Sequence, residues 1–300
     1  MKTLKTTKRQ DAIFCLLILA YPLIQFSIFY VGVNASSVLM AFQRYDSGKY
    51  FWFGLDNFRQ VIYNFGHLSE LQYAVKNSLV AYIVGLGIGA PLSLLFSFFL
   101  YKNIRGFRFY RVMLFLPSVI PAIVLVLLYM YFVDRAIPDL HFKLFQEQKL
   151  GIVSNMDTAF AAVLFFNIFT SFGPKTLMYS STMSGINDSV VESAKLDGAS
   201  FMREFFSICL PMIYPTIVTF LVAGVAGIFT NQLSLFSFFG STADFRMYTF
   251  GYYLYRNTQV AVSPAAYPYL SAVGLLMSLV AIPLTLVVRW LLLHYGPRTE

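Results

Sequence analysis

The chain has 300 residues, of which 58% are hydrophobic and only 12% are charged. A soluble domain is usually about 45–50% apolar and about 25% charged, so this composition excludes an ordinary soluble fold and predicts an integral membrane protein. A formal net charge of +8 would suggest nucleic acid as the partner of a soluble protein. Basic residues at the cytoplasmic ends of membrane spans give the same sum, so no nucleic-acid partner is expected.

Six stretches, in chain order, are long and apolar enough to cross a bilayer, because a helix needs roughly 20 apolar residues to span the hydrocarbon core. They are residues 12–33, 77–100, 112–133, 159–180, 212–230 and 268–293. The fourth stretch contains Gly173-Pro174, and we expect this pair to interrupt its helix. Long unbroken apolar stretches favour helices over a β-barrel. The predicted fold is an all-α integral membrane protein with about six transmembrane helices, in a single domain over residues 1–300.

Dense clusters of lysine and arginine set the expected orientation, because cytoplasmic segments carry an excess of these residues. One cluster precedes the first span, and the other fills the short connection between the second and third spans: Lys2, Lys5, Lys8 and Arg9; Lys102, Arg105, Arg108 and Arg111. Both termini are then expected in the cytoplasm, and the connections 34–75, 134–158 and 231–267 outside. The first span exceeds the usual apolar region of a signal peptide, about 7–15 residues, so we expect it to be retained.

The predicted spans contain no acidic residue, and the three histidines, His67, His141 and His294, lie outside them or at their edges. Proton-coupled transporters usually carry such groups in the membrane, so an ion-coupled secondary transporter is the less favoured alternative. The sequence contains neither a His-Glu-x-x-His motif nor a pair of carboxylates within the spans, so an intramembrane enzyme is not expected. The two cysteines, Cys15 and Cys209, do not suggest a metal site. The cation Lys175 could line a cavity or extend toward the cytoplasm, and we favour the extension.

The connection between the fourth and fifth spans, residues 181–208, has a distinctive pattern. Ser189 and Glu192 form a capping box, which predicts that a helix begins there. Ile186, Val190 and Ala194 recur at helical spacing as an apolar stripe, Gly198 should end this helix, and Ser200 can cap a second one. We expect a helix–turn–helix at the membrane surface, exposing a small, partly apolar knob suited to a groove on another protein.

This loop resembles the EAA loop of permease subunits of binding-protein-dependent ABC importers, whose pattern is Glu-Ala-Ala-x-x-x-Gly followed, after a spacer, by Ile-x-Leu-Pro. The matching positions are Glu192, Ala194, Gly198, Ile208, Leu210 and Pro211. Ser193 replaces an alanine of the pattern, and Asp197 and Ala199 fit its sugar-importer form. Three further stretches are similar to those of MalF-type carbohydrate permeases: Phe53-Gly54-Leu55-Asp56-Asn57-Phe58, Gly106-Phe107-Arg108-Phe109-Tyr110-Arg111 and Leu116-Pro117-Ser118-Val119-Ile120-Pro121.

The resemblance implies the bundle of a type I ABC importer permease, in the cytoplasmic membrane of a bacterium or archaeon, that translocates a sugar or oligosaccharide. The loop residues implied to couple to the ATPase are Glu192, Ser193, Ala194, Asp197, Gly198, Ala199, Leu210 and Pro211. The implied partners are a second permease subunit, expected to be a different chain, two nucleotide-binding ATPase subunits, an extracytoplasmic solute-binding protein and membrane lipid.

The chain itself is not expected to be an enzyme. Its Gly48-Lys49 pair is followed by Tyr50, so no P-loop is present. We expect no catalytic residue, metal ligand or cofactor on this chain, and ATP and Mg²⁺ are expected on the ATPase subunits.

Polar side chains within the spans mark a candidate substrate pathway. Asn167 lies in the fourth span, and Asn231 and Gln232 lie at the outer end of the fifth. Their amides could bind the hydroxyls of a sugar or bond between helices, and the sequence leaves both open. Tyr129 and Tyr131 of the third span are weaker candidates. Glycerol-3-phosphate or another polyol derivative is the less favoured alternative cargo. A phosphate would favour basic residues along the pathway, and Lys175 is the only obvious candidate.

Overall fold

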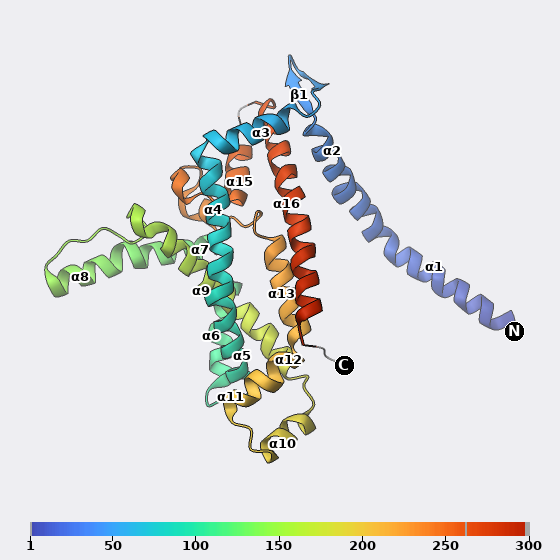
Figure 1. Ribbon diagram of the computed structural model, residues 1–300, viewed down its shortest axis with the longest axis vertical. Helices are drawn as coiled ribbons and strands as arrows, with labels where there is room; N and C mark the ends of the chain where they lie inside the picture. Colours follow the sequence, from blue (N-terminus) through green and yellow to red (C-terminus); the bar gives the residue numbers. More distant parts are fainter. Residues whose placement is uncertain (1, 262, 298–300) are drawn as a thin grey trace. The chain divides into compact units, whose positions relative to one another are not determined.

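The structure is a computed structural model that describes residues 2–261 and 263–297, with side chains from residue 12 onward. The chain divides into two compact units (Figure 1). Unit 1 comprises residues 1–64 and 261–277, and unit 2 comprises residues 65–260 and 278–300. Both are built almost wholly from helices, and the candidate functional site lies within unit 2.

Unit 1 begins with an apolar helix that runs through α1 (Lys2–Gln25), the π-helical segment η1 (Phe26–Gly32) and α2 (Val33–Met40). An antiparallel hairpin of β1 (Gln43–Asp46) and β2 (Lys49–Trp52) follows, with Gln43 opposite Trp52. Next comes α3 (Asp56–His67), which Asn57 anchors by donating hydrogen bonds to the carbonyl oxygens of Ala41 (2.8 Å) and Gln43 (2.7 Å).

Unit 2 contains two long, straight apolar helices that pack against each other. The first consists of α4 (Ser69–Val84), the π-helical segment η2 (Gly85–Gly89) and α5 (Ala90–Tyr101), and is 33 residues long. The second is α9 (Met156–Met183), with 28 residues. Each is long enough to cross a bilayer, since an α-helix rises about 1.5 Å per residue and the hydrocarbon core is about 30 Å thick.

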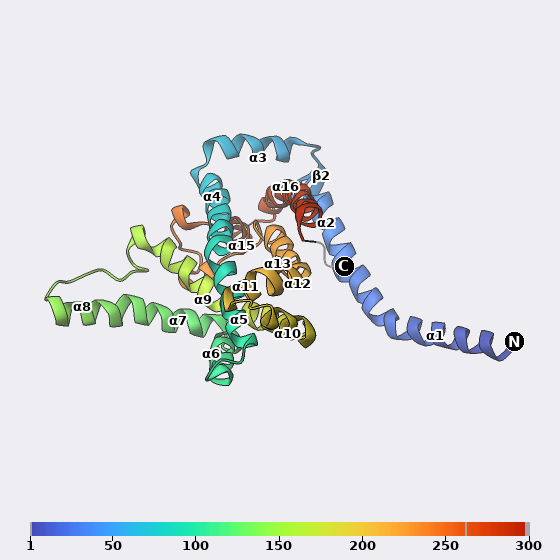
Figure 2. The ribbon, with the colours of Figure 1, turned by 60° about the horizontal axis from the view of Figure 1, so that its bottom comes forward.

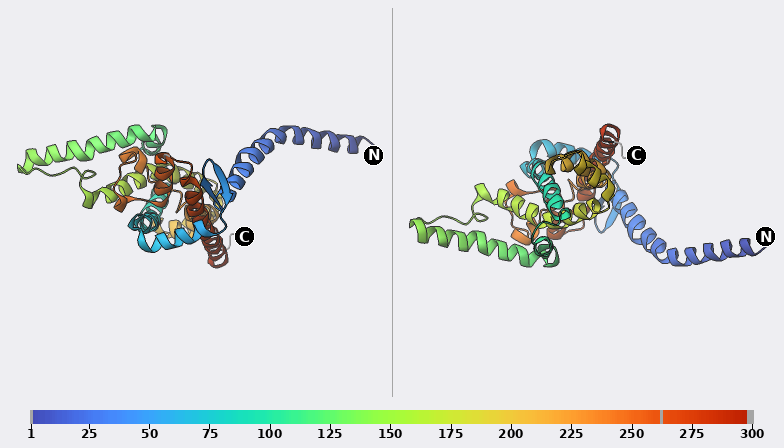
Figure 3. Two further views of the ribbon diagram at one scale, coloured as in Figure 1. Left: turned by 90° about the horizontal axis from the view of Figure 1, so that it is seen from above. Right: turned by 90° about the horizontal axis from the view of Figure 1, so that it is seen from below.

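Two further apolar segments of unit 2 are bent. The chain turns by 104° between α6 (Phe107–Val119) and the helical arm of α7 (Ala122–Tyr131), η3 (Phe132–Ala136) and α8 (Ile137–Phe145). This arm extends from α6 in both views of Figure 3. The predicted third span, residues 112–133, therefore corresponds to a bent pair of helices. Pro121 disfavours the helical conformation in the residue before it, and Ile120 is extended (φ −79°, ψ 135°).

The second bend, of 69°, separates two parts of the fifth span. Before it lie α11 (Phe201–Glu204), η4 (Phe205–Cys209) and α12 (Leu210–Met212), and after it α13 (Tyr214–Ala226). The helix α13 is thus shorter than the predicted 212–230 stretch. The remaining elements are α10 (Asp188–Leu196), α14 (Leu235–Phe239), η5 (Phe245–Met247), α15 (Phe250–Val260) and α16 (Ala266–Tyr295).

The expected interruption of the fourth span at Gly173-Pro174 is also wrong, because α9 runs through both residues. Gly173 lies against the backbone of α6, and a Cβ atom there would be only 1.7 Å from the carbonyl oxygen of Leu114. Packing against a neighbouring helix lets a transmembrane helix tolerate a proline. In the described part of the chain, four helices are long and apolar enough to cross a membrane, or six if each bent pair is one span. The prediction of an all-α fold with about six transmembrane helices is confirmed.

The close approach of α6 to α9 predicts that Gly173→Ala lowers the free energy of unfolding by about 1–3 kcal/mol, because the added methyl group overlaps the Leu114 carbonyl. Chemical denaturation in detergent micelles would measure this loss. Gly66→Ala is the matched control, since a Cβ atom at Gly66 has no described heavy atom within 4 Å. Equal stability of Gly173→Ala and the native protein would contradict the contact.

Candidate functional site

A cavity of about 220 Å³ lies within unit 2, between the α4–η2 helix, α9 and α13. Its lining is mainly apolar and contains these residues with polar side chains: Ser78, Tyr82, Asn167, Ser171, Lys175, Tyr179, Asn231 and Thr249. Small-molecule sites usually enclose roughly 300–1,000 Å³. The cavity is smaller than this range, so it could enclose only part of a sugar-sized molecule.

One face of α9 supplies the polar side of this cavity. Asn167, Ser171, Lys175 and Tyr179 recur every four residues and all line it, because residues four apart on an α-helix lie on the same face. Lys175 thus lies in a cavity lining, as one of its two predicted roles requires, and its extension toward the cytoplasm stays a prediction. Lys175 is partly buried in the lining, and no described residue forms a hydrogen bond or ion pair with it.

The amides of Asn167 and Asn231 both bond to the backbone of Leu233, in the turn after α13. The Asn167 side chain donates hydrogen bonds to the carbonyl oxygens of Val163 (3.0 Å) and Leu233 (2.8 Å). The Asn231 side-chain oxygen accepts one from the backbone N–H of Leu233 (2.8 Å). Both asparagines thus hold the turn and line the cavity, so the two roles left open by the sequence are compatible.

Three other pathway candidates are not part of the described cavity lining: Gln232, Tyr129 and Tyr131. The Tyr129 hydroxyl donates to the carbonyl oxygen of Ala162 (3.0 Å), and its ring packs against Phe166. Tyr131 is 71% exposed. Their roles in transport stay predictions. Sequence reasoning missed Ser78, Tyr82 and Thr249 as cavity residues. None of them belongs to a recognisable motif, and they come together only in the folded chain.

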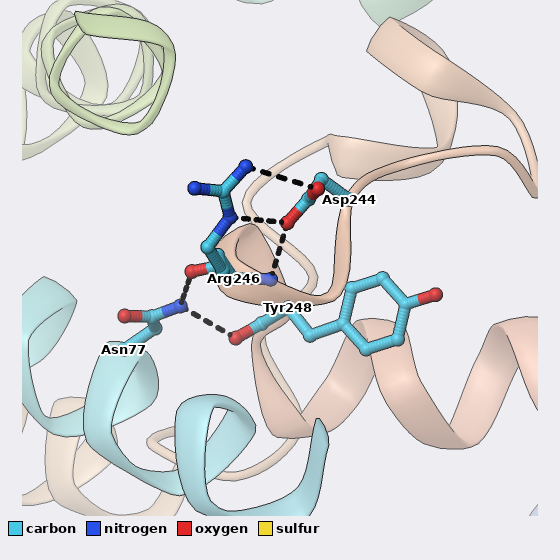
Figure 4. A network of polar contacts seen from close by, with 4 residues as sticks. All are labelled: Asn77, Asp244, Arg246 and Tyr248. Carbon is cyan, nitrogen blue, oxygen red and sulfur yellow. Dashed lines mark hydrogen bonds and ion pairs between the residues drawn. The ribbon is translucent and has the colours of Figure 1, made fainter. Parts of the chain in front are cut away.

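A polar network fixes the loop beside the cavity on the middle of α4 (Figure 4). The Asn77 side chain donates to the carbonyl oxygens of Arg246 (2.8 Å) and Tyr248 (2.9 Å). Asp244 accepts hydrogen bonds from the Arg246 backbone N–H (2.8 Å) and from its Nε (3.0 Å), and the side-chain bond holds the pKa of the Asp244 carboxyl below its ordinary value. The Ser78 hydroxyl accepts from the Phe250 N–H (2.9 Å), so the loop is held at both ends.

Loop 181–208, with α10 and α11, lies at the end of unit 2 opposite α15 (Figure 1), and Figure 2 brings this end forward. The predicted helix is present as α10, but Asn187, not Ser189, caps it: the Asn187 side-chain oxygen accepts from the Ser189 N–H (3.1 Å). The capping-box prediction is therefore wrong. Val191, not Val190, is buried, because it packs into the apolar cluster beneath the loop.

The turn between the two helices of this loop has the predicted form. Gly198 is left-handed (φ +76°), its N–H bonds to the Lys195 carbonyl (3.1 Å), and the Ala199 N–H bonds to the Ala194 carbonyl (2.9 Å). These two bonds are a Schellman motif, for which glycine is the favoured residue. Ser200 caps the second helix by accepting from the Arg203 N–H (3.3 Å).

The turn at Gly198 has several exposed residues. Glu192, Ser193, Asp197 and Gly198 are exposed, and Leu196 is 89% exposed. The other residues implied to couple to the ATPase are partly buried: Ala194, Ala199, Leu210 and Pro211. The turn therefore presents an exposed leucine beside charged side chains, and its docking role stays a prediction.

The inner side of the loop packs on a buried apolar cluster: Phe98, Tyr179, Met183, Ile186, Val191, Phe205, Cys209 and Ile213. Beside it, Lys102 at the end of α5 forms an ion pair with Glu204 of α11, whose side chain is only 5% exposed. The Lys102 ammonium also lies 5.5 Å from the Phe98 ring centre. Tyr179 belongs to this cluster and to the cavity lining, so one side chain contacts both regions.

A family model described as "binding-protein-dependent transport system inner membrane component" matches residues 85–300. The chain is 27% identical over 201 residues to the probable ABC transporter permease protein YesP of Bacillus subtilis, covering 65% of this chain and 63% of that protein. It is 29% identical over 174 residues to the sn-glycerol-3-phosphate transport system permease protein UgpA of Shigella flexneri, covering 57% of each. The chain thus spans less than two thirds of the length of these relatives.

Two solved structures have a similar fold. One is a bacterial ABC transporter involved in the import of the acidic polysaccharide alginate; its matched chain has a TM-score of 0.79 and 20% identity, covering 98% of this chain and 99% of that one. The other is a bacterial alginate ABC transporter in complex with an alginate pentasaccharide-bound periplasmic protein, with a TM-score of 0.78 and 20% identity. At this identity the likeness shows the fold.

Breaking the Lys102–Glu204 pair should be strongly destabilising. We expect Lys102→Met to lower the free energy of unfolding by about 3–5 kcal/mol, because it leaves the Glu204 carboxylate buried without its partner. The double variant Lys102→Met/Glu204→Met should recover most of that loss. Denaturation in micelles measures both. Asp56→Asn, which breaks the exposed Asp56–Arg59 pair, should change stability by less than about 1 kcal/mol; a similar loss in Asp56→Asn and Lys102→Met would contradict a buried pair.

The Asn77 contacts predict local opening of the loop in Asn77→Leu, because the carbonyls of Arg246 and Tyr248 lose their donor. Hydrogen exchange of backbone amides in residues 244–250 should accelerate roughly ten-fold or more. Asn257→Leu is the control, since the Asn257 side chain bonds to Tyr253 within its own helix. Unchanged exchange in Asn77→Leu would show that other contacts hold the loop.

Proposed function

Because the chain belongs to the family of binding-protein-dependent transport system inner membrane components, we propose that it is the permease subunit of an ATP-driven ABC importer for a sugar, an oligosaccharide or a related polyol derivative. The observation that carries this proposal is the exposed turn at Leu196–Gly198, supported from beneath by a cluster that includes the cavity residue Tyr179. A partner that moves this turn would push on side chains adjoining the cavity.

The proposed energy source is a separate pair of ATPase subunits that bind ATP and Mg²⁺. The chain has no P-loop, and its exposed Glu192, Leu196 and Gly198 suit docking into a groove on one ATPase subunit. Closure of the ATPase pair around ATP would then displace loop 181–208 together with α5 and α9. Such a rigid-body movement could switch the cavity between outward and inward access.

The proposed assembly also contains a second permease subunit, a different chain, which would complete the small cavity. An extracytoplasmic solute-binding protein would deliver the cargo, as the periplasmic protein in one similar structure supports. The protein is proposed to cross the cytoplasmic membrane of a bacterium or archaeon with both termini in the cytoplasm. The amides of Asn167 and Asn231 at the cavity favour a cargo with hydroxyl groups.

The coupling role predicts that Glu192→Lys and Gly198→Asp reduce ATP-dependent uptake at least about ten-fold in proteoliposomes, since each places a disruptive group on the docking surface and tenfold corresponds to about 1.4 kcal/mol. Gly198→Asp additionally strains a left-handed position. The assay uses the complete complex and three labelled probes: maltotriose, trigalacturonate and sn-glycerol-3-phosphate.

The control is Leu150→Asp. Leu150 is exposed, as Leu196 is, but lies outside loop 181–208. Co-purification of the ATPase subunits reports assembly in every variant. Full uptake by Glu192→Lys and Gly198→Asp would show that ATP energy enters elsewhere, and ATP-independent uptake by the native complex would favour a secondary transporter.

A further inference from the structure

Lys175 is the one charged residue in the described cavity lining. The other polar groups there are amides, hydroxyls and phenols, and no carboxylate shares the lining. Glu204, a buried carboxylate outside this lining, is already paired with Lys102. The described structure therefore offers the Lys175 ammonium no counter-charge.

The position of Lys175 on α9 is what directs it to the cavity. It follows Ser171 by four residues and Asn167 by eight, and all three line the same space. With a rise of about 1.5 Å per residue, the backbone positions of Asn167 and Lys175 are about 12 Å apart along the helix. An elongated cargo could contact an amide at one end of this stripe and an ammonium at the other.

Charged side chains inside a membrane protein are rare, and they normally pair with another group or serve a substrate pathway. The ammonium of lysine has three donors and no acceptor, so the ligand that satisfies it must supply acceptor oxygens. A negatively charged oxygen gives the stronger bond, because hydrogen bonds between ionised groups are roughly twice as strong as neutral ones. A neutral sugar would leave the charge of Lys175 without compensation.

We propose that Lys175 is the anion-binding residue of this cavity and that the cargo is a saccharide or polyol carrying a carboxylate or phosphate group. The proposal rests on the importer function proposed above and narrows its substrate class. Asn167 and Asn231 then bind hydroxyl groups of the same cargo, while Lys175 selects against uncharged sugars.

The test compares uptake of the same three probes by the native complex and by Lys175→Met and Lys175→Arg. Trigalacturonate offers carboxylates, sn-glycerol-3-phosphate offers a phosphate and maltotriose is neutral. We expect ATP-dependent uptake of one acidic probe, with little uptake of maltotriose and no competition from an excess of it. Lys175→Met should reduce this uptake at least about ten-fold, as expected for loss of a bond to a charged group, while Lys175→Arg keeps most of it. The preferred acidic probe identifies the anionic group.

Lys143→Met is the matched control, because Lys143 is exposed on α8, away from the cavity. Co-purification of the partner subunits confirms assembly, and Lys175→Gln replaces Lys175→Met if the latter does not assemble. Uptake of maltotriose equal to that of the acidic probes, or full acidic uptake by Lys175→Met, would overturn the anion-binding role and leave the importer function intact. ATP-dependent uptake of none of the probes by the native complex would count against both proposals.

Discussion

The packing of Tyr179 is the contact on which the proposed mechanism depends. Its side chain is almost fully buried, and it lines the cavity while packing with residues of loop 181–208. Close-packed interiors transmit displacement because they contain few voids into which a side chain can retreat. A movement of α10 that carries Val191 along must therefore shift the cavity wall as well, or leave a void in the cluster.

The Lys102–Glu204 ion pair fixes the orientation of α11 relative to α5 beside this cluster. Apolar contacts alone tolerate small rotations, whereas an ion pair beside the cluster fixes which side of α11 faces α5. Replacing a buried ion pair by well-packed apolar residues is often nearly neutral for stability. The contribution of the Lys102–Glu204 pair is therefore to position α11 against α5. At the opposite end of unit 2, Asn77 does the same for the loop that includes Arg246 and Tyr248.

Sequence patterns predicted the number of spans and the turn at Gly198, because span length and glycine conformation are local properties. They could not distinguish the two prolines: Pro121 ends a helix, whereas Pro174 lies inside one. The difference depends on the neighbouring α6 backbone at Gly173. Likewise, the surroundings of Lys175, Ser78 and Thr249 depend on helices distant in the sequence. The burial of Val191 in place of Val190 depends on the cluster against which α10 packs.

The stripe of Asn167, Ser171 and Lys175 has a consequence for how such a protein can diversify. These three side chains are absent from the buried cluster that supports the loop. Under the proposed cargo role, substitutions along the stripe would alter which molecules are accepted and leave the contacts that support the loop unchanged. Lineages descended from one ancestor would then acquire new nutrients through a few changes on a single helix face, without a compensating change in the proposed ATPase subunits.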